Sequence, residues 1–107
     1  MPFLRDHAAV EPPLAEVEGI PGWLLLEFGA PWCGHCQAAQ PALQQFVDAH
    51  ELLHLKIEDG KGRPLGRAFK VKLWPTAVLL HDGTEVARVV RPQTMADLQS
   101  LAAALPD

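Results

Sequence analysis

A short, almost continuously apolar run near the start of the chain most constrains its fold. Residues 23–28 read WLLLEF, in which Glu27 is the single charged residue. Such a run is typical of a β-strand that is buried on both faces of a sheet. A sheet covered on both faces needs helices on each side, so the run predicts an α/β fold.

The rest of the chain alternates strand-like and helix-like patterns. Asp82-Gly83 is a turn dipeptide, so the strands on either side of it should form a hairpin. Thr94 is a suitable N-cap for the last helix. The order predicts a central mixed sheet of four to five strands with helices on both faces. We expect further strands at 52–57, 76–80 and 85–90, an extended piece at 3–4, and helices near 13–18, 33–50, 65–69 and 95–105.

Length and charge limit the class of protein. The 107 residues fit one domain, 1–107, whose segment 1–22 is rich in proline. Nine basic and thirteen acidic residues give a net charge of −4, which offers no electrostatic reason to expect nucleic acid. No apolar run approaches the roughly 20 residues of a membrane span, and no signal segment is visible. We therefore expect a cytoplasmic protein without membrane contact; removal of a signal would make it periplasmic or otherwise exported.

The two cysteines, Cys33 and Cys36, stand at the start of the helix that follows the buried run. A bond between them closes a loop of only about four residues, which contributes about 2 kcal/mol in the chain-entropy model. The pair is therefore better suited to reversible oxidation and reduction than to stabilising the fold. A helix N-terminus favours a thiolate at Cys33, whereas Cys36 lies one turn further in. We expect an exposed, attacking Cys33 and a buried, resolving Cys36.

His35 lies between the two cysteines. When protonated it adds positive charge beside Cys33, which stabilises the reduced form and makes the disulfide a stronger oxidant. Other interpretations are an inert buried pair, metal or cluster ligation across a dimer, and half of a zinc site. The zinc site lacks a second pair of ligands, since the other histidines are scattered at positions 7, 50, 54 and 81. We expect no metal, and no cofactor beyond the redox-active Cys33–Cys36 disulfide.

The stretch EFGAPWCGHC, residues 27–36, resembles the active site of the thioredoxin superfamily, and in detail the CGHC site of protein disulfide isomerases. Pro41 matches the proline inside the family's active-site helix. Trp74-Pro75-Thr76 is similar to the family's x-Pro-Thr, where the proline is cis. The resemblance runs from about residue 23 to 105. It implies a thioredoxin fold with an abbreviated N-terminal part.

The resemblance also implies roles for residues at the site. Cys33 is then the nucleophile and Cys36 the resolving thiol. A cis Pro75 places the backbone of Trp74 where an extended substrate can hydrogen-bond to it. Arg91 lies two residues before the place of an isomerase arginine. The implied substrate-binding set is Trp32, Gly34, Trp74, Pro75 and Arg91, with Pro41 and Thr76 in support.

Behind the cysteines, Glu27 corresponds to the family's buried acid, which accepts a proton from the resolving thiol, and Lys56 to the lysine near that acid. The alternative is that Glu27 is a surface charge at a strand end. Gly29 stands where thioredoxins carry Trp and isomerases Tyr, which opens space beside the site. We expect the other histidines to be surface or packing groups.

The function implied is a thiol–disulfide oxidoreductase that reduces or exchanges disulfides in protein substrates. Its electron donor would be a thioredoxin reductase or glutathione, and we expect a monomer. The CGHC motif predicts a redox potential above that of ordinary thioredoxins. The alternative is a non-catalytic binding or chaperone module that presents a groove between Trp32 and Pro75 without turnover.

Overall fold

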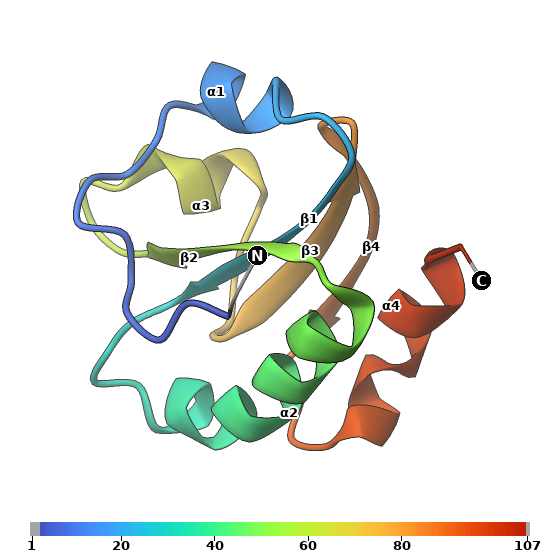
Figure 1. Cartoon of the computed structure of the whole chain (residues 1–107). Helices are drawn as coiled ribbons and strands as arrows, with labels where there is room; N and C mark the ends of the chain where they lie inside the picture. The colour runs from blue at the N-terminus through green and yellow to red at the C-terminus, as the bar shows by residue number, and fades with distance from the viewer. Residues whose placement is uncertain (1–2, 107) are drawn as a thin grey trace.

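The computed structural model describes residues 3–106 and has the expected α/β order (Figure 1). Every strand and helix predicted beyond residue 12 is present within a few residues of its expected bounds. None of the helices in this described part of the chain is long and apolar enough to cross a bilayer. The strands are β1 (Trp23–Gly29), β2 (Leu53–Glu58), β3 (Thr76–His81) and β4 (Thr84–Val90), and the helices are α1 (Leu14–Glu18), α2 (Gly34–His50), α3 (Pro64–Ala68), the 3-10 turn η1 (Met95–Leu98) and α4 (Gln99–Ala104).

The sheet is mixed, with the strand order β2-β1-β3-β4. β1 and β2 pair in parallel across the α2 crossover, which brings Glu27 opposite Lys56. The pairs β1–β3 and β3–β4 are antiparallel. Asp82 and Gly83 close the predicted hairpin with φ angles of 50° and 82°, which are the positive values that its tight turn requires. Four to five strands were expected, and the sheet has four strands among the described residues.

The extended piece expected at residues 3–4 does not form a fifth strand, because its polar backbone groups bond to side chains. The Leu4 N–H donates to His54 Nδ1 at 2.9 Å, and the Arg5 carbonyl accepts from Lys56 Nζ at 2.7 Å. A single backbone bond, from the Ala8 N–H to the Lys56 carbonyl, links this segment to β2. A strand needs a repeated ladder of such bonds. The N-terminal segment therefore lies against β2, where the side chains of His54 and Lys56 hold it.

The side chains of β1 alternate between two cores, as expected for a strand buried on both faces. Leu24, Leu26 and Phe28 pack on the side of α1 and α3. Leu25 packs on the opposite side, among residues of α2 and α4. Figure 1 shows α1 and α3 on one side of the sheet and α2 and α4 on the other. The predicted helix cover of both faces is confirmed.

The last helix begins as predicted at Thr94, but its first turn is the 3-10 turn η1. Asp97 Oδ2 accepts the backbone N–H groups of Gln93 and Thr94 at 2.9 and 3.1 Å and completes a capping box. These bonds to Gln93 and Thr94 hold the pKa of the Asp97 carboxyl below its ordinary value. The capping box thus fixes where the chain leaves the loop after β4.

Candidate active site

The two cysteines lie where β1 meets α2, joined by residues 30–33. Cys33 is the N-cap of α2, and its Sγ accepts the Cys36 backbone N–H at 3.2 Å. Both sulfurs are free thiols. The helix N-terminus directs unpaired N–H groups and partial positive charge at Cys33, as the sequence predicts. This arrangement favours negative charge on the Cys33 sulfur.

Cys33 was expected to be exposed, but its side chain is buried. Its exposed fraction is only 8%, against 3% for Cys36, because both side chains pack with Ala30 and Trp74. Cys33 is therefore the more accessible sulfur of the two, but not an exposed one. Burial, together with a hydrogen bond to Cys33, raises the pKa of the Cys36 thiol to about 12. Cys36 accordingly carries its proton at neutral pH and needs a proton acceptor before it can attack.

A groove of about 420 Å³ opens beside Cys33. The Trp32 and Trp74 rings meet edge to face, with centroids 5.4 Å apart, and Trp32 is 72% exposed. The Trp74–Pro75 peptide bond is cis, as the resemblance implies. Of the residues predicted to bind substrate or act in catalysis, those lining the groove are Trp32, Cys33, Gly34, His35, Trp74 and Arg91.

Arg91 is fixed to the groove by two hydrogen bonds. Its Nε donates to the Trp74 carbonyl at 2.9 Å, and its backbone N–H donates to the Pro75 carbonyl at 2.8 Å. Arg91 thus braces the backbone that the resemblance assigns to substrate. Thr76, which follows the cis proline, is buried, and its Oγ1 donates to the Leu73 carbonyl at 2.7 Å. Pro41 lies inside α2, which continues as one helix to His50.

Glu27 is fully buried, so the alternative of a surface charge is wrong. Its Oε1 lies 2.9 Å from His54 Nε2, and its Oε2 accepts from Gln40 Nε2 at 2.9 Å. Because His54 Nδ1 accepts the Leu4 N–H, the ring proton is on Nε2, and His54 donates to Glu27. Both carboxylate oxygens are therefore occupied by donors.

Lys56 is buried beside this acid, but Gln40 stands between the two charges. Lys56 Nζ donates to Gln40 Oε1 at 2.7 Å, and Gln40 Nε2 donates both to Glu27 and to the Cys36 carbonyl, each at 2.9 Å. Gln40 thereby connects the buried charges to the active-site helix. Among residues 3–106, no group of three or more His, Cys, Asp or Glu side chains could hold a metal ion.

Two members of this network, His54 and Gln40, are not among the predicted site residues. His54 is a packing group, as one of the two expectations had it, but it also donates to the buried acid. His54 is 1% exposed and stacks on Phe3, with ring centroids 4.6 Å apart. A signal was present in the strand itself: His54 and Lys56 occupy alternate positions of β2, and so face the same side as each other. A buried acid on the adjacent strand needs such partners.

Gly29 leaves space for Cys36 rather than for the substrate groove. A Cβ added at Gly29 would lie 2.5 Å from Cys36 Sγ and 3.9 Å from His7 Nε2. Gly29→Ala is therefore expected to displace the resolving thiol and to lower the free energy of unfolding of the reduced protein by about 1–3 kcal/mol. Urea unfolding of the reduced protein measures this loss.

The matched control is Gly34→Ala, where an added Cβ meets no atom within 4 Å. This variant should unfold at the same urea concentration as the parent, or slightly higher, because alanine restricts the unfolded chain. Equal stability of the parent and Gly29→Ala would show that the Cys36 side chain is not confined as described.

The thioredoxin family model matches residues 15–104. Thioredoxin 2 from Pseudomonas aeruginosa PAO1, solved in its reduced form, is 51% identical, with 94% of this chain and 96% of that chain covered and a TM-score of 0.79. The thioredoxin of Chlamydia pneumoniae is 40% identical over 73 residues, which are 64% of this chain and 69% of that protein. Thioredoxin H2-2 of Oryza sativa subsp. japonica is 37% identical over 71 residues, 63% of this chain; the chain spans about half, 51%, of that relative. The chain therefore belongs to the thioredoxin family of thiol–disulfide oxidoreductases, and Cys33 and Cys36 are its Cys-x-x-Cys dithiol.

Proposed function

We propose that this chain reduces disulfide bonds in protein substrates, with Cys33 as the attacking sulfur and Cys36 as the resolving sulfur. The observation that carries the proposal is the asymmetric placement of the two thiols. Cys33 caps α2, receives the Cys36 N–H and lines the groove, whereas Cys36 lies behind it with its pKa raised by burial.

The reaction has two exchange steps. The Cys33 thiolate attacks one sulfur of the substrate disulfide, so that a Cys33–substrate bond forms and the other substrate sulfur leaves as a thiolate. Cys36 then loses its proton and attacks Cys33, which forms the Cys33–Cys36 disulfide and releases the second substrate thiolate. The substrate gains two electrons and the chain loses two, which an external dithiol must restore.

In this proposal the groove holds an extended substrate segment against Trp74, which precedes the cis Pro75, and Trp32 covers the reacting sulfurs. Gly34 leaves the approach to Cys33 open, since no heavy atom lies within 4 Å of its Cβ position. Arg91, Pro41 and Thr76 support the geometry: Arg91 braces the Trp74 carbonyl, and Thr76 ties the turn before β3.

The resemblance implies that Glu27 accepts the Cys36 proton. Because the hydrogen bonds of Glu27 go to His54 and Gln40 and none joins it to Cys36 among the described residues, we assign Glu27 and Lys56 a positioning role through Gln40, which donates to the Cys36 carbonyl. The Glu27 charge also raises the pKa of Cys36. Its effect is smaller than those of burial, of the hydrogen bond to Cys33 and of the Cys33 charge.

The proposed partners are proteins with accessible disulfides and an electron donor, either a thioredoxin reductase or glutathione. We propose the cytoplasm as the compartment, because a reductase needs the reducing thiol pool found there. We propose a monomer, since the large apolar side chains exposed outside the groove among the described residues are few: Val10 and Leu14 in the N-terminal part, and Val86 and Val90 on β4.

Insulin reduction tests this function. With dithiothreitol as electron donor, the chain is expected to accelerate the precipitation of insulin B chains in proportion to its concentration. A parent protein that binds unfolded substrates but gives no acceleration would instead support the non-catalytic module.

We further propose that His35 raises the redox potential above the roughly −270 mV of thioredoxin, towards the isomerase range. His35 is exposed on the wall of the groove beside Cys33. Replacing it with proline or glutamine is expected to lower the potential by about 30 mV, equivalent to about 1.4 kcal/mol. Titration of the disulfide against glutathione measures the change. A parent potential at or below the thioredoxin value, or no change in either variant, would contradict the role of His35.

A further inference from the structure

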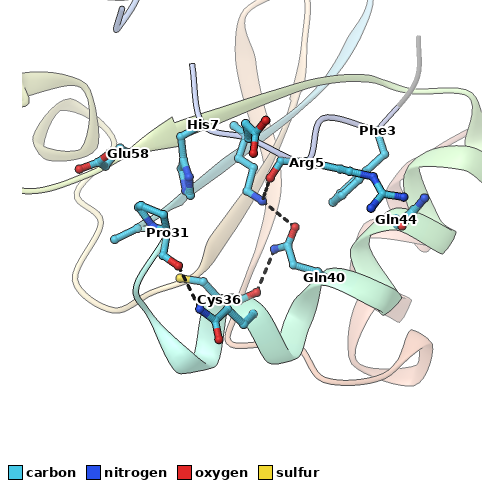
Figure 2. A pocket seen from close by; sticks show the side chains of 12 residues that line it. Phe3, Arg5, His7, Pro31, Cys36, Gln40, Gln44 and Glu58 are labelled. Atoms are coloured by element: carbon cyan, nitrogen blue, oxygen red, sulfur yellow. Dashed lines mark hydrogen bonds between the residues drawn. The ribbon is translucent and has the colours of Figure 1, made fainter. Parts of the chain in front are cut away.

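The dithiol faces two different cavities. Cys33 lines the groove with Trp32 and Trp74, whereas Cys36 lines a second cavity of about 510 Å³. We call the second one the rear cavity; Figure 2 shows it between the N-terminal segment and α2. Its lining includes the polar side chains of His7, Gln37, Gln40 and Lys56. A polar space of this size admits water.

His7, which lines this cavity, has a hydrogen-bonding atom that is not used. Its Nε2 is buried and has no hydrogen-bond partner. His7 Nε2 and Cys36 Sγ both approach the point where a Gly29 Cβ would lie, at 3.9 and 2.5 Å respectively. Figure 2 shows the His7 ring and Cys36 on the same side of the cavity, next to Pro31. Gly29, which has no side chain, thus leaves space next to both atoms.

The other candidate proton acceptor, Glu27, is engaged elsewhere. One of its oxygens accepts from His54 and the other from Gln40. It is also absent from the lining of the rear cavity. His7, in contrast, lines the same cavity as Cys36 and has a nitrogen without a hydrogen-bond partner.

The His7 ring is neutral near pH 7, mainly because it is buried. Burial is the main cause that lowers the pKa of His7, and Lys56 on β2 adds to it. Glu27 on β1, Glu58 on β2 and Asp6 on the same segment act in the opposite direction, but do not reverse the shift. A neutral ring offers one nitrogen lone pair, which is what a base requires.

We propose that His7 accepts the proton of Cys36 during the resolving step. The inference rests on the proposed reductase function. The Cys36 proton passes to His7, and the Cys36 thiolate attacks Cys33 of the mixed disulfide. The Cys33–Cys36 bond forms, the bond from Cys33 to substrate breaks, and the substrate thiolate leaves. The imidazolium then returns its proton to solvent.

The test separates the two exchange steps with dithiobis(nitrobenzoate), a symmetrical aryl disulfide whose thiolate product is yellow. The first thiolate reports attack by Cys33, and the second reports attack by Cys36. His7→Gln is expected to slow the second phase at least about 100-fold, in line with general base catalysis, and to leave the first phase unchanged. His81→Gln is the matched control, because His81 stacks on Trp23 at the far end of β3, and it should change neither phase.

The pH profile of the parent gives a second readout that needs no variant. The second phase should be independent of pH near neutrality and slow down below the lowered pKa of His7, where the ring becomes protonated. In His7→Gln this plateau should be replaced by a rate that rises steadily with pH.

Two outcomes would overturn the inference: an unchanged second phase in His7→Gln, or equal slowing of both phases in that variant. If Glu27→Gln slows the second phase and His7→Gln does not, Glu27 is the proton acceptor instead. A parent that releases no second thiolate and does not reduce insulin would instead contradict the reductase function itself.

Discussion

Replacing Cys33 with serine is expected to lower the rate of insulin reduction at least about 10³-fold, to the rate of dithiothreitol alone. A serine hydroxyl is not ionised at neutral pH and does not attack a disulfide sulfur, so the first exchange step is lost. Cys36 cannot replace it, because burial raises its pKa to about 12 and it lies outside the groove. The insulin precipitation assay at equal protein concentration measures the loss.

Cys36→Ser is the matched control, since it removes the other thiol of the same pair. This variant should still attack the substrate, but it cannot resolve the product. It is therefore expected to accumulate a covalent adduct with a disulfide substrate, visible on a non-reducing gel. If the roles of the thiols are assigned wrongly, Cys33→Ser will form the adduct instead.

Alkylation of the reduced parent tests the same asymmetry. At neutral pH one equivalent of iodoacetamide should be incorporated per chain, and peptide mapping should place it on Cys33. Cys36 should react only as the pH rises towards its raised pKa. Equal labelling of both thiols at neutral pH would count against the whole mechanism.

The fold could be predicted largely because local sequence patterns agree with it. The apolar run at residues 23–28 is buried on both faces, the Asp82-Gly83 turn forms its hairpin, and Thr94 caps the last helix. The placement of Cys33 at a helix N-terminus also follows from local order alone: a strand, a short connection, then a helix.

The surroundings of Cys36 could be predicted only in part, because they depend on contacts between distant segments. The resemblance implied Glu27 and Lys56, but the register that also brings His54 beside β1 is not specified by the local sequence pattern. The path of the N-terminal segment is set by bonds from Leu4 and Arg5 to side chains of β2 rather than by a strand. His7 reaches the rear cavity only because of this path and the absence of a side chain at Gly29.

The buried pair of Glu27 and His54 should be the most stability-critical part of the site. His54→Ala is expected to lower the free energy of unfolding by about 3–5 kcal/mol, because it leaves a Glu27 oxygen and the Leu4 N–H buried without their partner. It also removes the ring on which Phe3 stacks. Urea unfolding of the reduced protein measures the effect.

Two comparisons show whether the loss comes from the unpaired acid. His81→Ala removes an exposed histidine that also stacks on an aromatic ring, Trp23, and should change stability by less than about 1 kcal/mol. The double variant Glu27→Leu/His54→Leu removes both partners, and should be about 1–3 kcal/mol more stable than His54→Ala, since no buried carboxylate remains to be satisfied. If the double variant is instead the less stable of the two, the loss in His54→Ala arises from packing, and Glu27 does not depend on His54 for its burial.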